Sequence, residues 1–123
     1  DFLIIDMPPG TGDTQLTFAQ DIKIDGSIIV STPQELALMD VQRGIKMFEK
    51  TKIKILGLVD NMSFFKGSDG KIYNIFGEGG VERTAREFNK KFLGKIICDI
   101  LIIREQDFLQ PKDIAKLGPI HLT

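Results

Sequence analysis

The stretch DFLIIDMPPGTGD, residues 1–13, decides the predicted fold. Its apolar run Phe2–Ile5 is continuous, and short continuous apolar runs are typical of strands covered on both faces of a parallel sheet. The run ends at Asp6 and passes into a turn that contains Gly10 and Gly12. Because ligands bind beyond the carboxyl ends of the strands in open α/β sheets, we expect the Asp6 carboxylate to face a binding crevice.

The rest of the chain alternates short apolar runs with amphipathic stretches. Within residues 34–50, apolar side chains recur at spacings of three and four, which predicts a helix with one apolar face. Strands that alternate with helices predict βαβ units in an α/β fold with three layers and a mostly parallel sheet. The expected strands are 2–5, 27–30, 55–59 and 92–98, and the expected helices follow Asp13, span 34–50 and follow the GEGG motif at 77–80.

Two segments depart from this alternation. Residues 63–76 carry apolar side chains on both sides of Gly67–Gly70, which predicts a β-hairpin or an ordered loop. The end of the chain contains two prolines and a glycine without a sustained period. We therefore expect one folded unit over residues 1–105 and a divergent, irregular tail over 106–123.

The composition excludes several classes of function. The 123-residue chain carries 16 Lys and Arg against 17 Asp and Glu without a basic block, so we expect no nucleic-acid partner. No apolar run approaches the roughly 18 to 20 residues that span a bilayer, and no signal-peptide pattern is found, so we expect a cytoplasmic protein without a membrane partner. The single cysteine, Cys98, lies in an apolar run and is expected to be a buried side chain.

Asp6 and the glycines after it suit a phosphate and metal site. Mg²⁺ keeps much of its water shell and takes few direct protein ligands, so a carboxylate at a strand end can hold one of its waters. Gly10 and Gly12 free the backbone to approach or move around a phosphate. The alternative is that Asp6 only caps the following turn.

Four stretches in order resemble one known family. They are DFLIIDMPPGTGDTQLTFAQ, VSTPQELALMDVQRGIKMF, ILGLVDNMSFF and NIFGEGG, and the resemblance runs from Asp1 to about Glu105. They are similar to the Mrp/ApbC iron-sulfur cluster carriers, P-loop ATPases related to MinD and ParA. The resemblance implies a partial three-layer P-loop NTPase fold, with residues 1–105 as the C-terminal part of the ATPase domain. It also implies a dimeric ATP hydrolase that binds Mg-ATP and delivers a labile iron-sulfur cluster to apoproteins.

The resemblance assigns roles to single residues. Asp6 matches the catalytic acid that orients Mg²⁺ and its waters, and Gly10 with Gly12 matches a mobile turn. Asn61 matches an asparagine that hydrogen-bonds adenine, a task that suits an amide because it offers a donor and an acceptor. The alternative for Asn61 is a turn residue at a strand end. Gln34 and Glu35 are expected either to support the residues that contact the nucleotide or to begin a helix.

This sequence departs from the family at three sites. It contains no GKGGVGKS-like loop, whose main-chain N–H groups and lysine hold phosphates, so we expect no ATP hydrolysis by these residues alone. The Cys-x-x-Cys pair that holds the cluster is replaced by Lys66–Gly70, and thiolates are the ligands that clusters need. Cys98 is not expected to substitute for them. Ile97 stands where the family commonly has a proline.

Three functions stay open at this point. The chain can serve as a truncated part of a cluster carrier that needs an N-terminal half, or as a catalytically inactive remnant that only binds other proteins. A MinD-like or ParA-like positioning ATPase is disfavoured, because Pro111, Gly118 and Pro119 interrupt the tail where membrane-targeting members carry an amphipathic helix. We also expect the chain to associate with itself or with an N-terminal fragment, since a missing central strand would leave backbone groups unpaired.

Overall fold

The computed structural model describes residues 3–7 and 10–98. The predicted tail over 106–123 lies outside these residues. None of the helices within the described part is long and apolar enough to cross a membrane. The elements in chain order are α1 (Asp13–Asp21), β1 (Ser27–Ser31), α2 (Glu35–Lys50), β2 (Ile55–Asp60), β3 (Phe65–Lys66), β4 (Ile72–Tyr73), α3 (Gly80–Glu87) and β5 (Phe92–Lys95).

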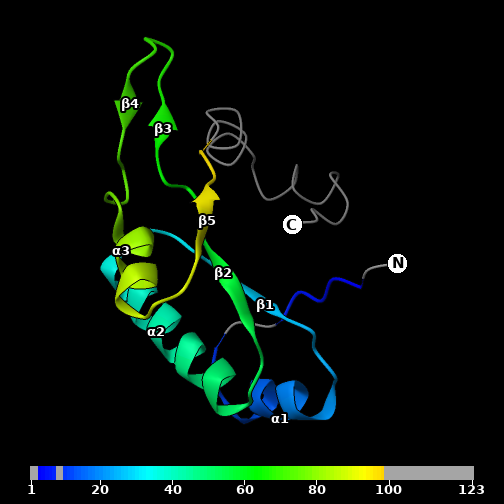
Figure 1. Cartoon of the computed structure of the whole chain (residues 1–123). Helices are drawn as coiled ribbons and strands as arrows, with labels where there is room; N and C mark the ends of the chain where they lie inside the picture. The colour runs from blue at the N-terminus through cyan, green and yellow to red at the C-terminus, as the bar shows by residue number, and fades with distance from the viewer. Residues whose placement is uncertain (1–2, 8–9, 99–123) are drawn as a thin grey trace.

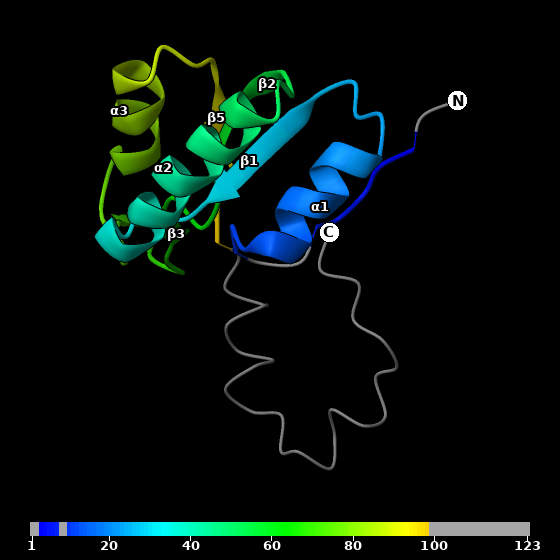
Figure 2. The ribbon, with the colours of Figure 1, turned by 90° about the horizontal axis from the view of Figure 1, so that it is seen from below.

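Strands β1, β2 and β5 form one parallel sheet in the order β1-β2-β5. Helix α2 connects β1 to β2, and α3 precedes β5, so each parallel pair is joined through a helix as βαβ units require. Both helices pack on one face of the sheet and against each other, while Figure 2 shows α1 across β1 from them. The predicted α/β class with a parallel sheet is confirmed.

The core lies between this face and the two helices. Val41 and Ile45 of α2 meet Leu58 of β2, and Val81 and Ala85 of α3 complete the cluster. The predicted helix over 34–50 is confirmed, because its apolar positions include those that this cluster buries. Gln34 is the N-cap residue of α2, as expected for a helix start.

Glycine at position 80 lets the two helices approach. A Cβ there would lie 2.7 Å from the Leu38 Cδ1 atom and 2.9 Å from the Pro33 carbonyl oxygen. Any larger residue would therefore push the start of α3 away from α2. The GEGG motif thus positions a helix as well as a turn.

The predicted strand at residues 2–5 is wrong over its described part. Residues 3–7 belong to no strand, and the side chains of Leu3 and Ile4 are 86% and 91% exposed. An extended segment needs a neighbour that satisfies its main-chain groups, and no described strand pairs with residues 3–7. On the sheet face away from α2 and α3, Ile28 and Val30 are also more than half exposed.

The predicted hairpin is confirmed. Strands β3 and β4 pair antiparallel, and the Phe65 and Tyr73 rings lie 6.1 Å apart. Figure 1 shows this hairpin projecting beyond the sheet.

The last strand is shorter than the predicted 92–98. Strand β5 ends at Lys95, and the next residues bond to the segment that leads into the hairpin, with the Cys98 N–H donating to the Phe64 carbonyl at 2.8 Å. Cys98 is buried, as predicted.

Candidate nucleotide cleft

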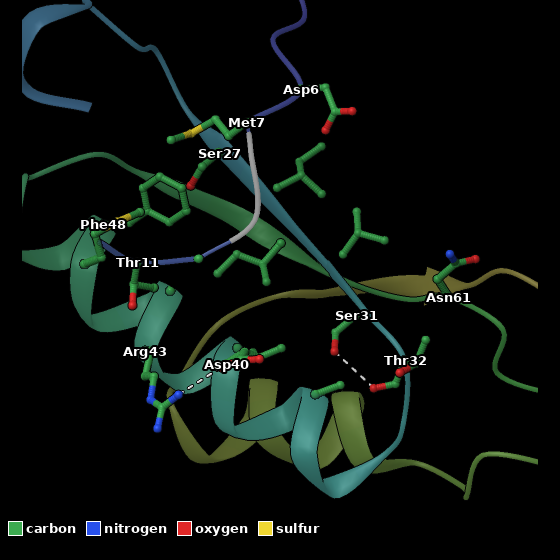
Figure 3. Close-up of a pocket in the computed structure, with 18 of the residues that line it drawn as sticks. Asp6, Met7, Thr11, Ser27, Ser31, Thr32, Asp40, Arg43, Phe48 and Asn61 are labelled. Carbon is green, nitrogen blue, oxygen red and sulfur yellow. Dashed lines mark hydrogen bonds and ion pairs between the residues drawn. The ribbon is translucent and has the colours of Figure 1, made fainter. Parts of the chain in front are cut away.

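A cleft of about 760 Å³ lies beside β1. All five residues of β1 line it, although alternate side chains of a strand point to opposite faces. The cleft therefore follows the free edge of the strand, where main-chain groups have no partner strand among the described residues. Its other walls include α2 and the residues Asp6, Met7, Gly10 and Thr11, as Figure 3 shows in close-up.

Three of the four predicted site residues line this cleft. Asp6 and Gly10 come from the N-terminal segment and Asn61 from the end of β2, although they lie far apart in the sequence. Gly10 has a φ of 110°, which favours glycine and fits the predicted turn. Gly12 does not line the cleft, because it is the N-cap residue of α1 and its carbonyl accepts the Leu16 N–H at 3.1 Å.

Asp6 occupies a different setting from the one predicted. Its side chain is exposed and follows an irregular segment, so it does not sit at the end of a sheet strand. An exposed carboxylate can still hold a water of a hydrated Mg²⁺, since that task needs no direct contact with the ion.

Asn61 is half-buried, and both its main chain and its side chain are hydrogen-bonded. Its main-chain N–H donates to the Ser31 carbonyl at 2.7 Å, which ties the end of β2 to the end of β1. Its side-chain Oδ1 accepts the Met62 N–H at 3.0 Å. A ligand in the cleft that donates to this oxygen would therefore share it with the Met62 N–H.

The α2 wall of the cleft adds an ion pair and apolar surface. Arg43 donates to Asp40 at 3.1 Å, and both side chains are largely exposed. Met47 and Phe48 line the cleft nearby. This wall therefore suits contact with a flat ring better than it suits binding of a phosphate.

Sequence reasoning missed Asp60, the last residue of β2. Its side chain is 0% exposed, and neither carboxylate oxygen has a hydrogen-bond partner. Burial raises the pKa of Asp60, while the charge of Lys95 lowers that pKa and the charge of Glu82 raises it. The signal was present, because Asp60 ends an apolar run directly before Asn61, just as Asp6 ends its own run.

The tip of the hairpin is occupied by its own hydrogen bonds. Asp69 accepts the Lys71 main-chain N–H at 2.9 Å through Oδ1 and the Tyr73 hydroxyl at 2.7 Å through Oδ2. These bonds lower the pKa of Asp69 and raise that of Tyr73. A Cβ at Gly67 would lie 2.6 Å from the Asp69 Oδ1 atom, so the turn requires glycine there.

The donor set of the hairpin does not fit an iron-sulfur cluster. Lys66–Gly70 offers no thiolate, and Cys98 is buried. Across the described residues, no three His, Cys, Asp or Glu side chains gather in a way that could hold a metal ion.

Comparison with known proteins decides the family. The family described as "ParA: NUBPL iron-transfer P-loop NTPase" matches residues 1–117. The chain belongs to this family. The resemblance to P-loop cluster carriers is thereby confirmed.

Curated relatives carry the name iron-sulfur cluster carrier protein. Those of Synechocystis and Escherichia coli K12 are 46% and 44% identical over 102 and 117 residues, which cover 81% and 94% of this chain. That of Pseudomonas fragi is 45% identical over 116 residues, or 94% of this chain. The matched part is 29%, 32% and 40% of the three relatives, so the chain spans about a third of their length.

A solved structure shares the fold. A nucleotide-binding protein from Archaeoglobus fulgidus in complex with ADP is 38% identical, with a TM-score of 0.68 over 92% of this chain and 46% of its own. The predicted P-loop NTPase fold is therefore confirmed. The roles of Asp6, Gly10, Gly12 and Asn61 stay predictions, as does the boundary at residue 105.

Proposed function

We propose that this chain forms one wall of the nucleotide site in an ATP-dependent iron-sulfur cluster carrier. The observation that carries the proposal is the meeting of Asp6, Gly10 and Asn61 at one cleft. In this proposal Asp6 holds a water of Mg²⁺, Gly10 and Gly12 form the mobile turn, and Asn61 hydrogen-bonds adenine. The ADP complex of the Archaeoglobus fulgidus protein, which has the same fold, supports a nucleotide as the ligand.

The phosphates need a second segment. A phosphate-binding loop supplies main-chain N–H groups and a lysine, and this sequence contains no GKGGVGKS-like stretch. The basic side chain in the cleft, Arg43, is paired with Asp40. We propose that a strand with its loop pairs along the free edge of β1, whether it belongs to the same polypeptide or to another. Unpaired strand edges are well suited to accept such a strand.

In this mechanism, the residues of this chain would orient the ligand. The second segment would stabilise the charge that develops on the phosphates. Asp6 would direct a metal-bound water, because its carboxylate accepts hydrogen bonds only. Mg²⁺, when bound, would neutralise charge that develops on the phosphates. We expect hydrolysis only when the phosphate loop is supplied.

In this proposal the iron-sulfur cluster is cargo, and apoproteins are its acceptors. Since Lys66–Gly70 supplies no thiolate, we propose that cluster contact does not pass through this hairpin. The alternative function, a binding module without catalysis, is favoured by the absence of both a GKGGVGKS-like loop and hairpin thiolates from this sequence.

Nucleotide binding to the full chain tests the proposal. Titration with Mg-ADP is measured by calorimetry for the wild type and for Asn61→Ala, with Asn74→Ala as the matched exposed control outside the cleft. We expect Asn61→Ala to weaken Mg-ADP binding about tenfold, because one or two hydrogen bonds to the ligand are lost. Asn74→Ala should leave the affinity unchanged. Equal affinities for all three proteins would contradict the role of Asn61.

Hydrolysis separates the two candidate functions. ATP hydrolysis is measured for the wild type, Asp6→Ala and Asp25→Ala, each with an added polypeptide that carries a GKGGVGKS loop and its strand. ATP turnover that Asp6→Ala abolishes and the exposed control Asp25→Ala preserves would support the carrier. Binding of the polypeptide without turnover would favour the binding module.

A further inference from the structure

The chain turns sharply between β2 and the hairpin, at residues 60–63, which we call the corner. The Asp60 carbonyl accepts the Ile96 N–H at 2.7 Å, and the Ser63 N–H donates to the Ile96 carbonyl at 3.0 Å. Together with the bond from Asn61 to Ser31, these contacts fix the corner to the segments on both sides of β2. The hairpin begins two residues later, so its direction depends on the corner (Figure 1).

Two costly features flank Asn61 within the corner. Asp60 is fully buried with both carboxylate oxygens unpartnered, and burial raises its pKa. Met62 has a φ of 53°, a left-handed conformation that residues other than glycine rarely adopt. Strained or unsatisfied groups persist only where their surroundings hold them, and they cluster at elements that switch.

The Asn61 side chain is what holds Met62. Its Oδ1 accepts the Met62 N–H, and the same side chain lines the cleft. A ligand that bonds to both the donor and the acceptor of the Asn61 amide requires this amide to turn toward the cleft, and that turn takes Oδ1 away from the Met62 N–H. The left-handed conformation then loses the contact that stabilises it.

An alternative arrangement is available on the other side of the corner. Lys95 of β5 is the register partner of Asp60, so its side chain leaves the sheet on the same face. The Lys95 side chain is exposed, neither oxygen of Asp60 bonds to it, and the other charged group that acts on Asp60 is Glu82 of α3. A relaxed corner would let the Asp60 carboxylate meet this ammonium group.

We propose that the corner is a two-state hinge, in which occupation of the cleft at Asn61 releases Met62 and changes the direction of the β3–β4 hairpin. The ligand part of this inference rests on the proposed nucleotide function. The hinge itself does not, because it is a property of the bonds within the corner.

Hydrogen exchange of the hairpin amides, residues 64–76, tests the hinge in the full chain without ligand. Asn61→Ala removes the acceptor of the Met62 N–H, and we expect roughly three- to tenfold faster hairpin exchange. Asn61→Asp keeps a side-chain oxygen acceptor and should exchange like the wild type. Unchanged exchange in Asn61→Ala would overturn the proposal.

A second variant guards against simple loss of folding. Glycine adopts the left-handed conformation without strain, so Met62→Gly combined with Asn61→Ala should restore slow hairpin exchange. Lys52→Gly, which relieves a similar φ of 59° in the loop before β2, is the matched control and should not rescue Asn61→Ala. Rescue by Lys52→Gly, or none by Met62→Gly, would overturn the hinge.

Mg-ADP then separates the two proposals. If calorimetry detects binding, hairpin exchange in the wild type should quicken on adding Mg-ADP, and no change would overturn the ligand part of the inference. If calorimetry detects no binding, the proposed function fails, while the ligand-free variants still decide the hinge.

Discussion

The region of the cleft beside β1 and the tip of the β3–β4 hairpin differ in whether their polar groups have hydrogen-bond partners. At the cleft, a strand edge lacks a partner strand within the described chain, and the carboxylate of Asp60, the last residue of the neighbouring strand β2, is buried on the α3 side without a hydrogen bond. At the hairpin tip, each Asp69 oxygen is bonded and the ring of Tyr73 packs beside Phe65. The free edge of β1 can accept a ligand or a further segment, whereas the polar groups at the hairpin tip are already bonded to each other.

The largest expected effect comes from the core between the sheet and helices α2 and α3, which borders the cleft through Val41. Leu58 is fully buried between the sheet and α3, so Leu58→Ala should lower the free energy of unfolding by about 3 kcal/mol. Leu36→Ala, at a position 75% exposed on α2, should change it by less than about 0.5 kcal/mol. Urea unfolding measures both. A small effect of Leu58→Ala would mean that the stability of the cleft wall does not depend on this core.

A smaller effect is expected at Asp60, with a defined dependence on pH. The raised pKa means that the folded state binds the proton more tightly than the unfolded chain does. The contribution of Asp60 to stability is therefore greatest below its ordinary pKa of 3.8 and is lost as pH rises through the raised value. Asp60→Asn removes the buried charge and should stabilise the protein by about 1 kcal/mol at neutral pH.

Unfolding curves measured across this pH range check the Asp60 prediction. The exposed Asp25→Asn is the control and should keep the wild-type pH dependence. If Asp60→Asn kept the wild-type slope as well, Asp60 would have a partner in solution, and the contrast with Asp69 would disappear.

Asp69 should behave with the opposite sign. Its pKa is lowered by the hydrogen bonds from Lys71 and Tyr73, so its contribution is present above the ordinary value of 3.8 and is lost as pH falls through the lowered value. Because Tyr73 is the single tyrosine, spectrophotometric titration reads its pKa directly. Asp69→Asn should move the Tyr73 pKa down toward 10.0, whereas Ser68→Ala should not.

The smallest effect is expected at Arg43, which lines the cleft without a buried contact. Its ion pair with Asp40 joins side chains that are 61% and 71% exposed, and such pairs contribute little. Arg43→Gln should therefore change both the free energy of unfolding and the affinity for Mg-ADP only marginally. A tenfold loss of affinity would place this guanidinium on the phosphates and extend the cleft toward α2.

Much of the fold followed from local patterns. The spacing of three and four in α2 and the short apolar runs of β1 and β2 predicted these elements within one or two residues. The glycines at 67 and 70 predicted the hairpin, since its turn needs them for close approach and a left-handed φ. Part of the site followed in the same way, because polar residues after apolar runs gather at the ends of parallel strands.

The remainder depended on which segments become neighbours. Leu3–Ile5 has the composition of a buried strand, yet no described strand pairs with it and its side chains stay exposed. Strand β5 stops at Lys95 because the chain then leaves β2: the Ile96 N–H still donates to the Asp60 carbonyl at the end of β2, but the Cys98 N–H donates to the Phe64 carbonyl on the approach to the hairpin. Asp60 and Asn61 are consecutive, yet Asp60 is buried near Glu82 of α3 and Asn61 lines the cleft.

The sequence by itself thus determined the periodic elements, the turns, the family and the absence of thiolates from the hairpin. Only the tertiary structure decided that Asp6, Gly10 and Asn61 share a cleft, that Gly12 caps a helix and that the Asp60 carboxylate lacks a partner. The physical reason is that periodicity and turn preference are properties of consecutive residues. Burial, strand pairing and hydrogen-bond satisfaction instead depend on segments that are distant along the chain.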